Sequence, residues 1–267
     1  MDDFNMPSNR NDYSYYSDGQ VRFKQAVWNN CRNQDGPCSG CDLNNSKPQF
    51  GAFDTDAKLM VVAEAPGEGT GGSRTQDTNK ENNDLDEVPN FLKYDKMIVD
   101  KWSQSAGSGG SLGYIDNLLR AENDLALTVE DVYYTNAIKC PKSDDNNETE
   151  DGRGNCRSYL KYEIQELVEP NVIIGFSGNA IQSVSDVLGV EQINGVEPSG
   201  NTSLCSLINQ GDGRFPTFGD SPKLIPSPHW AMQNSFESYA EEHIDWMANP
   251  EDYWTILAET VSDSLAE

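Results

Sequence analysis

Four cysteines have a spacing that suits ligands of a metal site. Cys38 and Cys41 form a C-x2-C pair, and Cys140 and Cys156 stand far downstream with a predicted loop of fifteen residues between them. Thiols grouped in this way ligate a metal or an iron–sulfur cluster more often than they form a disulfide framework, unless the chain is secreted. A structural zinc ion also accepts four thiolates, so zinc remains open beside a cluster.

Two of the six cysteines belong to neither spacing. A buried, unreactive thiol is the default interpretation of both Cys31 and Cys205. Cys31 stands only seven positions before Cys38. It is therefore close enough in sequence to compete with Cys38 as a ligand.

Three polar residues stand where predicted strands end. Asn136 ends the strand that begins at Val132, Glu64 follows the run KLMVVA, and His229 follows the last apolar run. Open parallel sheets bind ligands at the carboxyl ends of their strands, so these side chains are candidates for one site. Plainer interpretations are a turn cap for Asn136, one more acid among 44 for Glu64, and a surface or capping role for His229.

The elements that must position these residues are short apolar runs alternating with helical patterns. Such alternation predicts an α/β fold with a mostly parallel sheet and helices on both faces, in three layers. Helices are expected from Val21 to Cys31, from Cys156 to Val168, from Gly178 to Leu188 and from Glu251 onward, and residues 190–222 are expected to be loop and short strand. The expected strands are 58–63, 132–134, 171–176 and 223–226.

The chain divides into a short arm and one domain. Residues 1–20 are polar and acidic and are expected to be disordered, and residues 21–267 are expected to form a single domain with a polar insertion near 70–110. The arm lacks the charged-then-apolar pattern of a secretion signal, and no run approaches the roughly 20 apolar residues that a spanning helix needs. We therefore expect a cytoplasmic protein that does not contact a membrane.

The charge is strongly acidic and spread along the chain. Asp and Glu number 44 against 19 Lys and Arg, which gives a formal net charge of -25, and hydrophobic residues make up 36%. By itself this argues against nucleic acid, whose phosphates are bound by Lys and Arg. The pattern also suits a cytoplasm near saturating salt, where the Debye length falls to about 3 Å or less and self-repulsion is screened. An ordinary acidic, solvated surface is the alternative.

Several segments together resemble the family 4 uracil-DNA glycosylases, the iron–sulfur branch of that superfamily. The similarity covers roughly residues 38–233, and the segment TNAIKC with its paired cysteine spacings is its most specific part. The segments, in chain order, are KLMVVAEAPGE, VYYTNAIKC, the C-x15-C spacing, VEPNVIIGFSGNAI and IPSPHWA. The resemblance implies a uracil-DNA glycosylase-like three-layer α/β/α sandwich with a central, mostly parallel four-stranded sheet.

The resemblance also implies an activity and a cofactor. The activity is base excision repair of DNA: hydrolysis of the N-glycosidic bond of flipped-out uracil, leaving an abasic site, by a monofunctional enzyme that we expect to be a monomer. The cofactor is a [4Fe–4S] cluster without a necessary redox role. Its implied ligands are Cys38, Cys41, Cys140 and Cys156.

The resemblance assigns further roles at the sheet edge. A side-chain amide can donate to O4 and accept from N3–H of uracil but not of cytosine, and Asn136 is the candidate for this reading. Glu64 would position water, and His229 would donate to uracil O2 as the base leaves. Ala65 and Gly67, in the turn after Glu64, would contact the substrate.

The chain departs from the family pattern at two places. Members carry a phenylalanine that stacks on uracil, whereas residues 106–110 here read AGSGG, and loss of the stack would weaken base holding by roughly 1–3 kcal/mol. In the family, proline follows the histidine, whereas Pro228 precedes His229 here. The missing aromatic and the acidic surface favour an alternative: a catalytically weak relative that binds DNA or a nucleotide and keeps the cluster for structure.

Overall fold

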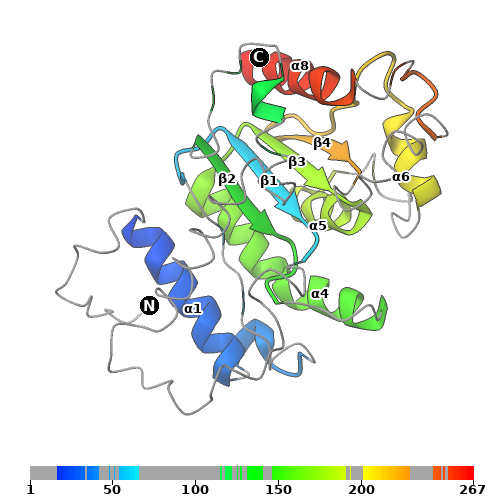
Figure 1. Cartoon of the computed structure of the whole chain (residues 1–267). Helices are drawn as coiled ribbons and strands as arrows, with labels where there is room; N and C mark the ends of the chain where they lie inside the picture. The colour runs from blue at the N-terminus through cyan, green and yellow to red at the C-terminus, as the bar shows by residue number, and fades with distance from the viewer. Residues whose placement is uncertain are drawn as a thin grey trace.

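A four-stranded, fully parallel sheet forms the centre of the protein. The computed structural model describes residues 17–33, 35–41, 48, 51, 54–65, 115, 118–121, 125, 127, 131–140, 146–190, 193, 201–228, 243–247, 249 and 252–267, of which 32, 146–151 and 201–203 are described in their backbone only. The strand order is β2-β1-β3-β4 (Figure 1). The strands are β1 (Leu59–Ala63), β2 (Val132–Asn136), β3 (Val172–Phe176) and β4 (Lys223–Ser227). The expected α/β fold with a parallel four-stranded sheet is confirmed.

The strands form from runs that are apolar at nearly every position. Every residue of β1, β2 and β3 is buried, as is every residue of β4 after Lys223. A strand covered on both faces has no solvated side, so its sequence shows no polar alternation. This is why the four expected runs became strands, with boundaries within two residues of the prediction.

Helices cover the sheet on both faces. Helix α5 (Gly178–Leu188) contacts β1, β3 and β4, and α8 (Tyr253–Ala266) contacts β3. Figure 1 shows α8 on the side of the sheet opposite α4 and α5. Gly175 in β3 permits this close packing, because a Cβ there would lie 2.8 Å from Ile181 Cγ1. The buried apolar residues of the helices and the sheet form one core.

The segment between Cys140 and Cys156 is more helical than its sequence predicts. Helix α4 (Asn146–Tyr162) begins ten residues before Cys156 and continues into the π-helix η5 (Glu163–Val168), so the prediction of a fifteen-residue loop is wrong for its second part.

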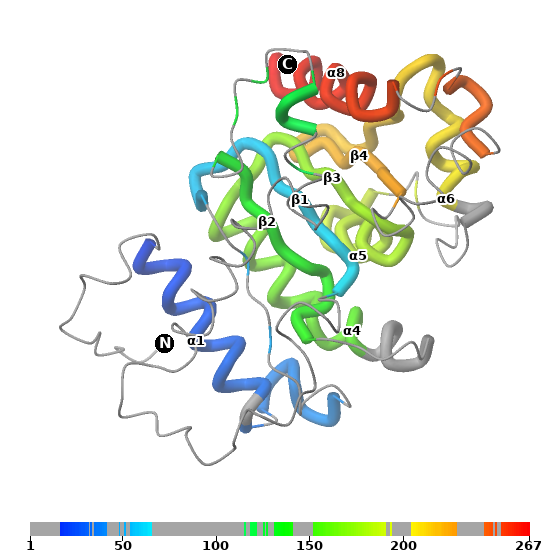
Figure 2. The backbone as a smooth tube through the Cα atoms, in the orientation of Figure 1, coloured from blue at the N-terminus to red at the C-terminus, as the bar shows by residue number. Residues whose placement is uncertain are grey.

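The remaining elements lie at the two ends of the fold. Helix α1 (Asp18–Asn33) begins three residues inside the stretch that we expected to be a disordered arm, and the short 3-10 helix η2 (Gly36–Cys38) contacts both α1 and α4. Helix α6 (Asn201–Ile208) lies where loop and short strand were expected. Figure 2 follows the backbone from α1 through the sheet to α8. The expected insertion near 70–110 lies outside the described residues.

No helix in the part of the chain that the structure describes is long and apolar enough to cross a membrane.

Candidate functional site

The carboxyl ends of β1 and β2 bring Glu64 and Asn136 together. Ala63 is paired with Asn136 in the parallel ladder. The pairing continues beyond the strands, because the backbone N–H of Ala137 donates to Ala63 O at 2.7 Å and that of Ile138 donates to Glu64 O at 2.8 Å. The backbone of Glu64 is therefore fixed beside the segment that follows Asn136.

The Asn136 side chain is buried with an unused hydrogen-bonding capacity. The residue is 1% exposed, and within the described residues neither its Nδ2 nor its Oδ1 has a hydrogen-bond partner. Leaving a buried polar group unsatisfied costs about 1–3 kcal/mol, so native proteins rarely keep one without a reason. Within the described residues the amide makes no backbone hydrogen bond of the kind that a cap of the turn after β2 would make. A ligand with one acceptor and one donor would satisfy it.

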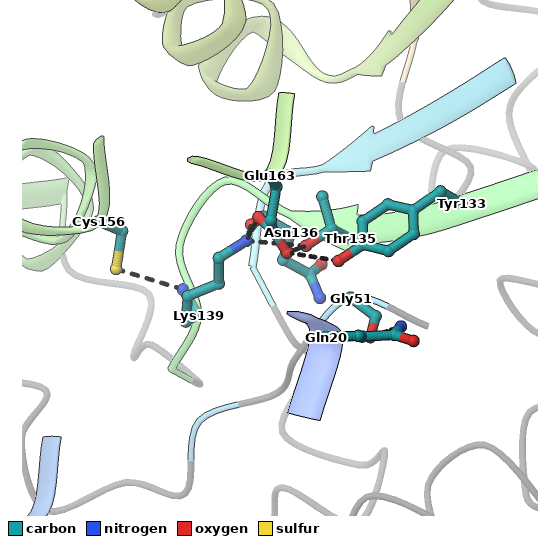
Figure 3. A network of polar contacts seen from close by, with 8 residues as sticks. All are labelled: Gln20, Gly51, Tyr133, Thr135, Asn136, Lys139, Cys156 and Glu163. Atoms are coloured by element: carbon teal, nitrogen blue, oxygen red, sulfur yellow. Dashed lines mark hydrogen bonds and ion pairs between the residues drawn. The ribbon is translucent and has the colours of Figure 1, made fainter. Parts of the chain in front are cut away.

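A buried polar network lies directly behind this amide (Figure 3). Lys139 and Glu163 form an ion pair whose side chains are 1% and 0% exposed. The Tyr133 hydroxyl donates to Glu163 Oε1 at 3.0 Å, and the Thr135 hydroxyl donates to the same oxygen at 2.8 Å. The family pattern contains the lysine, but its glutamate partner comes from the junction of α4 and η5, which the sequence did not single out.

The four expected ligand cysteines and Cys31 lie in one buried neighbourhood. All five thiols are buried. The Sγ atom of Cys31 is 3.2 Å from that of Cys38 and 3.8 Å from that of Cys140. The Lys139 backbone N–H donates to Cys156 Sγ at 3.4 Å. Helix α1, helix η2, the segment after β2 and helix α4 thus each contribute a thiol.

The surroundings of Cys31, Cys38 and Cys156 raise the pKa of each thiol and so favour its neutral form. The hydrogen bond with Cys140 and burial raise the pKa of Cys31, and the hydrogen bond with Cys31 and burial raise the pKa of Cys38. Burial raises the pKa of the Cys156 thiol to about 12, although the backbone N–H and the charge of Lys139 act in the opposite direction. Without a positive group to balance them, several thiolates would not be stable here.

The donor chemistry of this neighbourhood suits a thiolate-bound metal or cluster, but the side-chain geometry is not that of a formed site. In the residues that are described, no group of three or more His, Cys, Asp or Glu side chains is arranged to hold a metal ion. A cationic centre would stabilise thiolates that burial otherwise disfavours. Cys31 is buried, as its default interpretation expects, and it contacts two expected ligands, one of them the Cys38 with which it was expected to be able to compete.

The other candidates are only partly placed. Ala65 is half-buried and follows Glu64 at the end of β1. Gly67 and His229 lie outside the described residues. Two positions before His229, Ser227 is buried, and its hydroxyl is hydrogen-bonded with that of Tyr253.

Similarity to known proteins extends over much of the chain. The family model described as the uracil DNA glycosylase superfamily matches residues 50–251. The chain is 26% identical over 156 residues to the type-4 uracil-DNA glycosylase of Archaeoglobus fulgidus. That match covers 58% of this chain and 61% of the relative, so it spans about three fifths of the relative's length.

Proposed function

Since this chain belongs to the uracil DNA glycosylase superfamily, we propose that it removes uracil from DNA by hydrolysing the N-glycosidic bond and leaving an abasic site. The observation that carries the proposal is the Asn136 amide, buried and without a partner among the described residues, at the carboxyl edge of the sheet beside Glu64. We place this activity in base excision repair in the cytoplasm and propose that the protein acts as a monomer.

Recognition of uracil would rest on Asn136. An enzyme that works on a base takes it out of the stack and holds it in a pocket. In such a pocket Asn136 Nδ2 donates to uracil O4, and Asn136 Oδ1 accepts from N3–H. Cytosine presents an amino group and an unprotonated N3 at the same positions, so both contacts become donor against donor or acceptor against acceptor. The amide therefore selects by polarity as well as by shape.

Cleavage needs stabilisation of opposite charges on the sugar and on the base. Positive charge builds on the sugar, and a carboxylate such as Glu64 stabilises it and orients the attacking water. Negative charge builds on the departing uracil, and a donor to O2 stabilises it; we assign this role to His229. Ala65 and Gly67, in the turn after Glu64, would lie against the base.

We further infer that Cys38, Cys41, Cys140 and Cys156 hold a [4Fe–4S] cluster. These cysteines would let a bound cluster cross-link η2, the end of β2 and α4, a structural role that requires no redox step. Its support is the shared burial of thiols from separate elements and the type-4 relative. A structural zinc ion is the alternative, because it accepts the same donors.

The experiment that tests the function is uracil release. Protein purified anaerobically in molar KCl is incubated with end-labelled oligonucleotides that carry one uracil opposite G, opposite A or unpaired, and alkali-labile breaks are followed. We expect breaks at uracil and none at matched thymine or cytosine. Folded, metal-loaded protein that produces no breaks over a range of salt would refute the enzyme and leave the catalytically weak DNA- or nucleotide-binding relative, which the absence of an aromatic residue in 106–110 favours.

We also infer adaptation to high salt, from the net charge of -25. At low salt the acidic groups repel one another in the folded state, and KCl screens that repulsion. We expect the free energy of unfolding to rise by at least about 2 kcal/mol between 0.1 and 3 M KCl, which raises the melting midpoint by roughly 4–8 °C. The measurement is thermal unfolding by circular dichroism across the salt series. A midpoint that is constant or falls with KCl would indicate an ordinary acidic surface.

A further inference from the structure

A contribution to stability does not explain why Lys139 and Glu163 form a buried ion pair. Both side chains are essentially fully buried. Taking two charges out of water costs several kcal/mol per ion, and apolar residues of similar volume often replace such a pair without loss. Buried ion pairs are therefore weak stabilisers. A buried pair next to a ligand site can instead fix the positions of the groups that bind the ligand.

The contacts of the pair converge on the end of β2. Lys139 Nζ donates to Thr135 Oγ1 at 2.7 Å and to the backbone carbonyl of Asn136 at 2.6 Å. Glu163 Oε1 accepts from Tyr133 and Thr135, the alternate residues of the same strand. The backbone of Asn136 is thus held by Lys139 in the segment after β2 and, through Lys139, by Glu163 of η5, while its amide receives no hydrogen bond from the network. In Figure 3 the amide points away from the ion pair.

A second set of contacts connects the segment after β2 to the buried thiols. Lys139 donates its backbone N–H to Cys156 Sγ, and Glu163 is the first residue of the π-helix that continues the helix of Cys156. Single π-turns occur frequently at functional sites because they reorient side chains out of the regular α-helical pattern. The main chain and the side chain of Lys139 therefore both bind the unit formed by α4 and η5.

We propose that Lys139 and Glu163 are positioning residues that hold Asn136 in the orientation needed to read the base. This inference rests on the proposed function. Lys139 fixes the Asn136 carbonyl, and Glu163 holds Lys139 and the two strand hydroxyls in place. The amide is left unsatisfied and pre-oriented, so the ligand does not have to compete with a protein partner for it.

The test separates positioning from folding by removing both charges together. Lys139→Met alone leaves a buried carboxylate without its cation, and we expect it to lower the melting midpoint. In Lys139→Met with Glu163→Gln, the amide oxygen of the new glutamine can still accept from Tyr133 and Thr135, while the hydrogen bonds from Lys139 Nζ to the Asn136 carbonyl and to Thr135 Oγ1 are lost. We expect the double variant to recover most of the midpoint while kcat for uracil release stays about 100-fold below wild type, with KM for DNA within about threefold.

The matched control is the same exchange at an exposed pair. Arg214 and Asp263 are 66% and 64% exposed, so Arg214→Met with Asp263→Asn should change neither the midpoint nor kcat. A folded Lys139→Met/Glu163→Gln variant with wild-type kcat overturns this inference alone. Wild-type protein without uracil release overturns the proposed function, and this inference with it.

Thr135→Val decides the question if the double variant fails to fold. Valine is close in shape to threonine and suits a buried strand, and the exchange removes only the hydroxyl that joins Lys139 to Glu163. A kcat about tenfold below wild type with unchanged KM for DNA supports positioning. An unchanged kcat in the folded variant overturns it.

Discussion

Replacing Asn136 by leucine is expected to stop uracil release and to stabilise the protein. Leucine keeps the branching and approximate size of asparagine, so little packing is lost. It removes two polar atoms that are buried without partners among the described residues, and each such group costs about 1–3 kcal/mol. We therefore expect kcat/KM for uracil to fall at least about 100- to 1,000-fold and the free energy of unfolding to rise by about 1 kcal/mol or more.

Two measurements check this result: alkali-labile breaks in uracil-containing oligonucleotides, and denaturant unfolding of the same preparation. Asn171→Leu is the control, because Asn171 is exposed just before β3, at the opposite edge of the same sheet. The control should leave the activity unchanged. If Asn136→Leu destabilises the protein and spares the activity, the amide caps the turn after β2 and does not read a base.

When a residue binds a ligand, its replacement by an apolar residue is expected to raise the stability of the free protein and to lower its activity. A ligand site keeps polar groups unsatisfied until the ligand arrives, so the free protein is less stable than it would otherwise be. Replacing an asparagine with a purely structural role would instead lower the stability and leave the activity unchanged. The two interpretations that the sequence left open for Asn136 are therefore separated by the sign of one stability change.

The sheet was predictable from the sequence because its signal is local. Runs such as KLMVVA and NVIIGF are apolar throughout, and a parallel strand covered on both faces has that appearance. Helix α5 begins and ends at the predicted residues, since Ser177 caps its first turn and Gly189 takes the left-handed conformation at its end. That Glu64 and Asn136 lie near each other also follows from a general rule, because the carboxyl ends of parallel strands meet at the same edge of a sheet.

The rest depended on tertiary contacts that no local pattern contains. Helix α4 extends through polar residues with weak helical preference, because packing against α5 and η2 holds it. The contact of Cys31 with Cys140 joins residues 109 positions apart. The partner of Lys139 is one of 44 acidic residues, and only the fold identifies Glu163. Whether a buried amide has a partner is likewise a property of the whole structure.

Removal of a cluster ligand is the second change with a large expected effect. Wild-type protein purified anaerobically should contain about four iron and four sulfide per chain, against about one zinc if the alternative holds. Cys140→Ser should lose most of the metal, because Cys140 directly follows Lys139, whose backbone N–H donates to Cys156 Sγ, and its own Sγ lies 3.8 Å from that of Cys31. Loss of a structural metal is among the few single changes that cost more than about 4–5 kcal/mol, so the melting midpoint should fall by roughly 10–20 °C.

Metal analysis, visible absorption and thermal unfolding measure these changes. Cys205→Ser is the matched control, since Cys205 is equally buried but lies on α6. Retention of metal and midpoint in Cys140→Ser would refute the ligand assignment.

Cys31 and Cys38 then decide which thiols complete the set. Their sulfur atoms are 3.2 Å apart, so either could occupy the same ligand position. The proposed assignment requires that Cys31→Ser keeps the cluster and that Cys38→Ser loses it. The reverse result would make Cys31 the ligand and Cys38 the spare thiol. Full metal content in both single variants and loss only in the double variant would show that each can replace the other, which a contact this close makes physically possible without movement of α1.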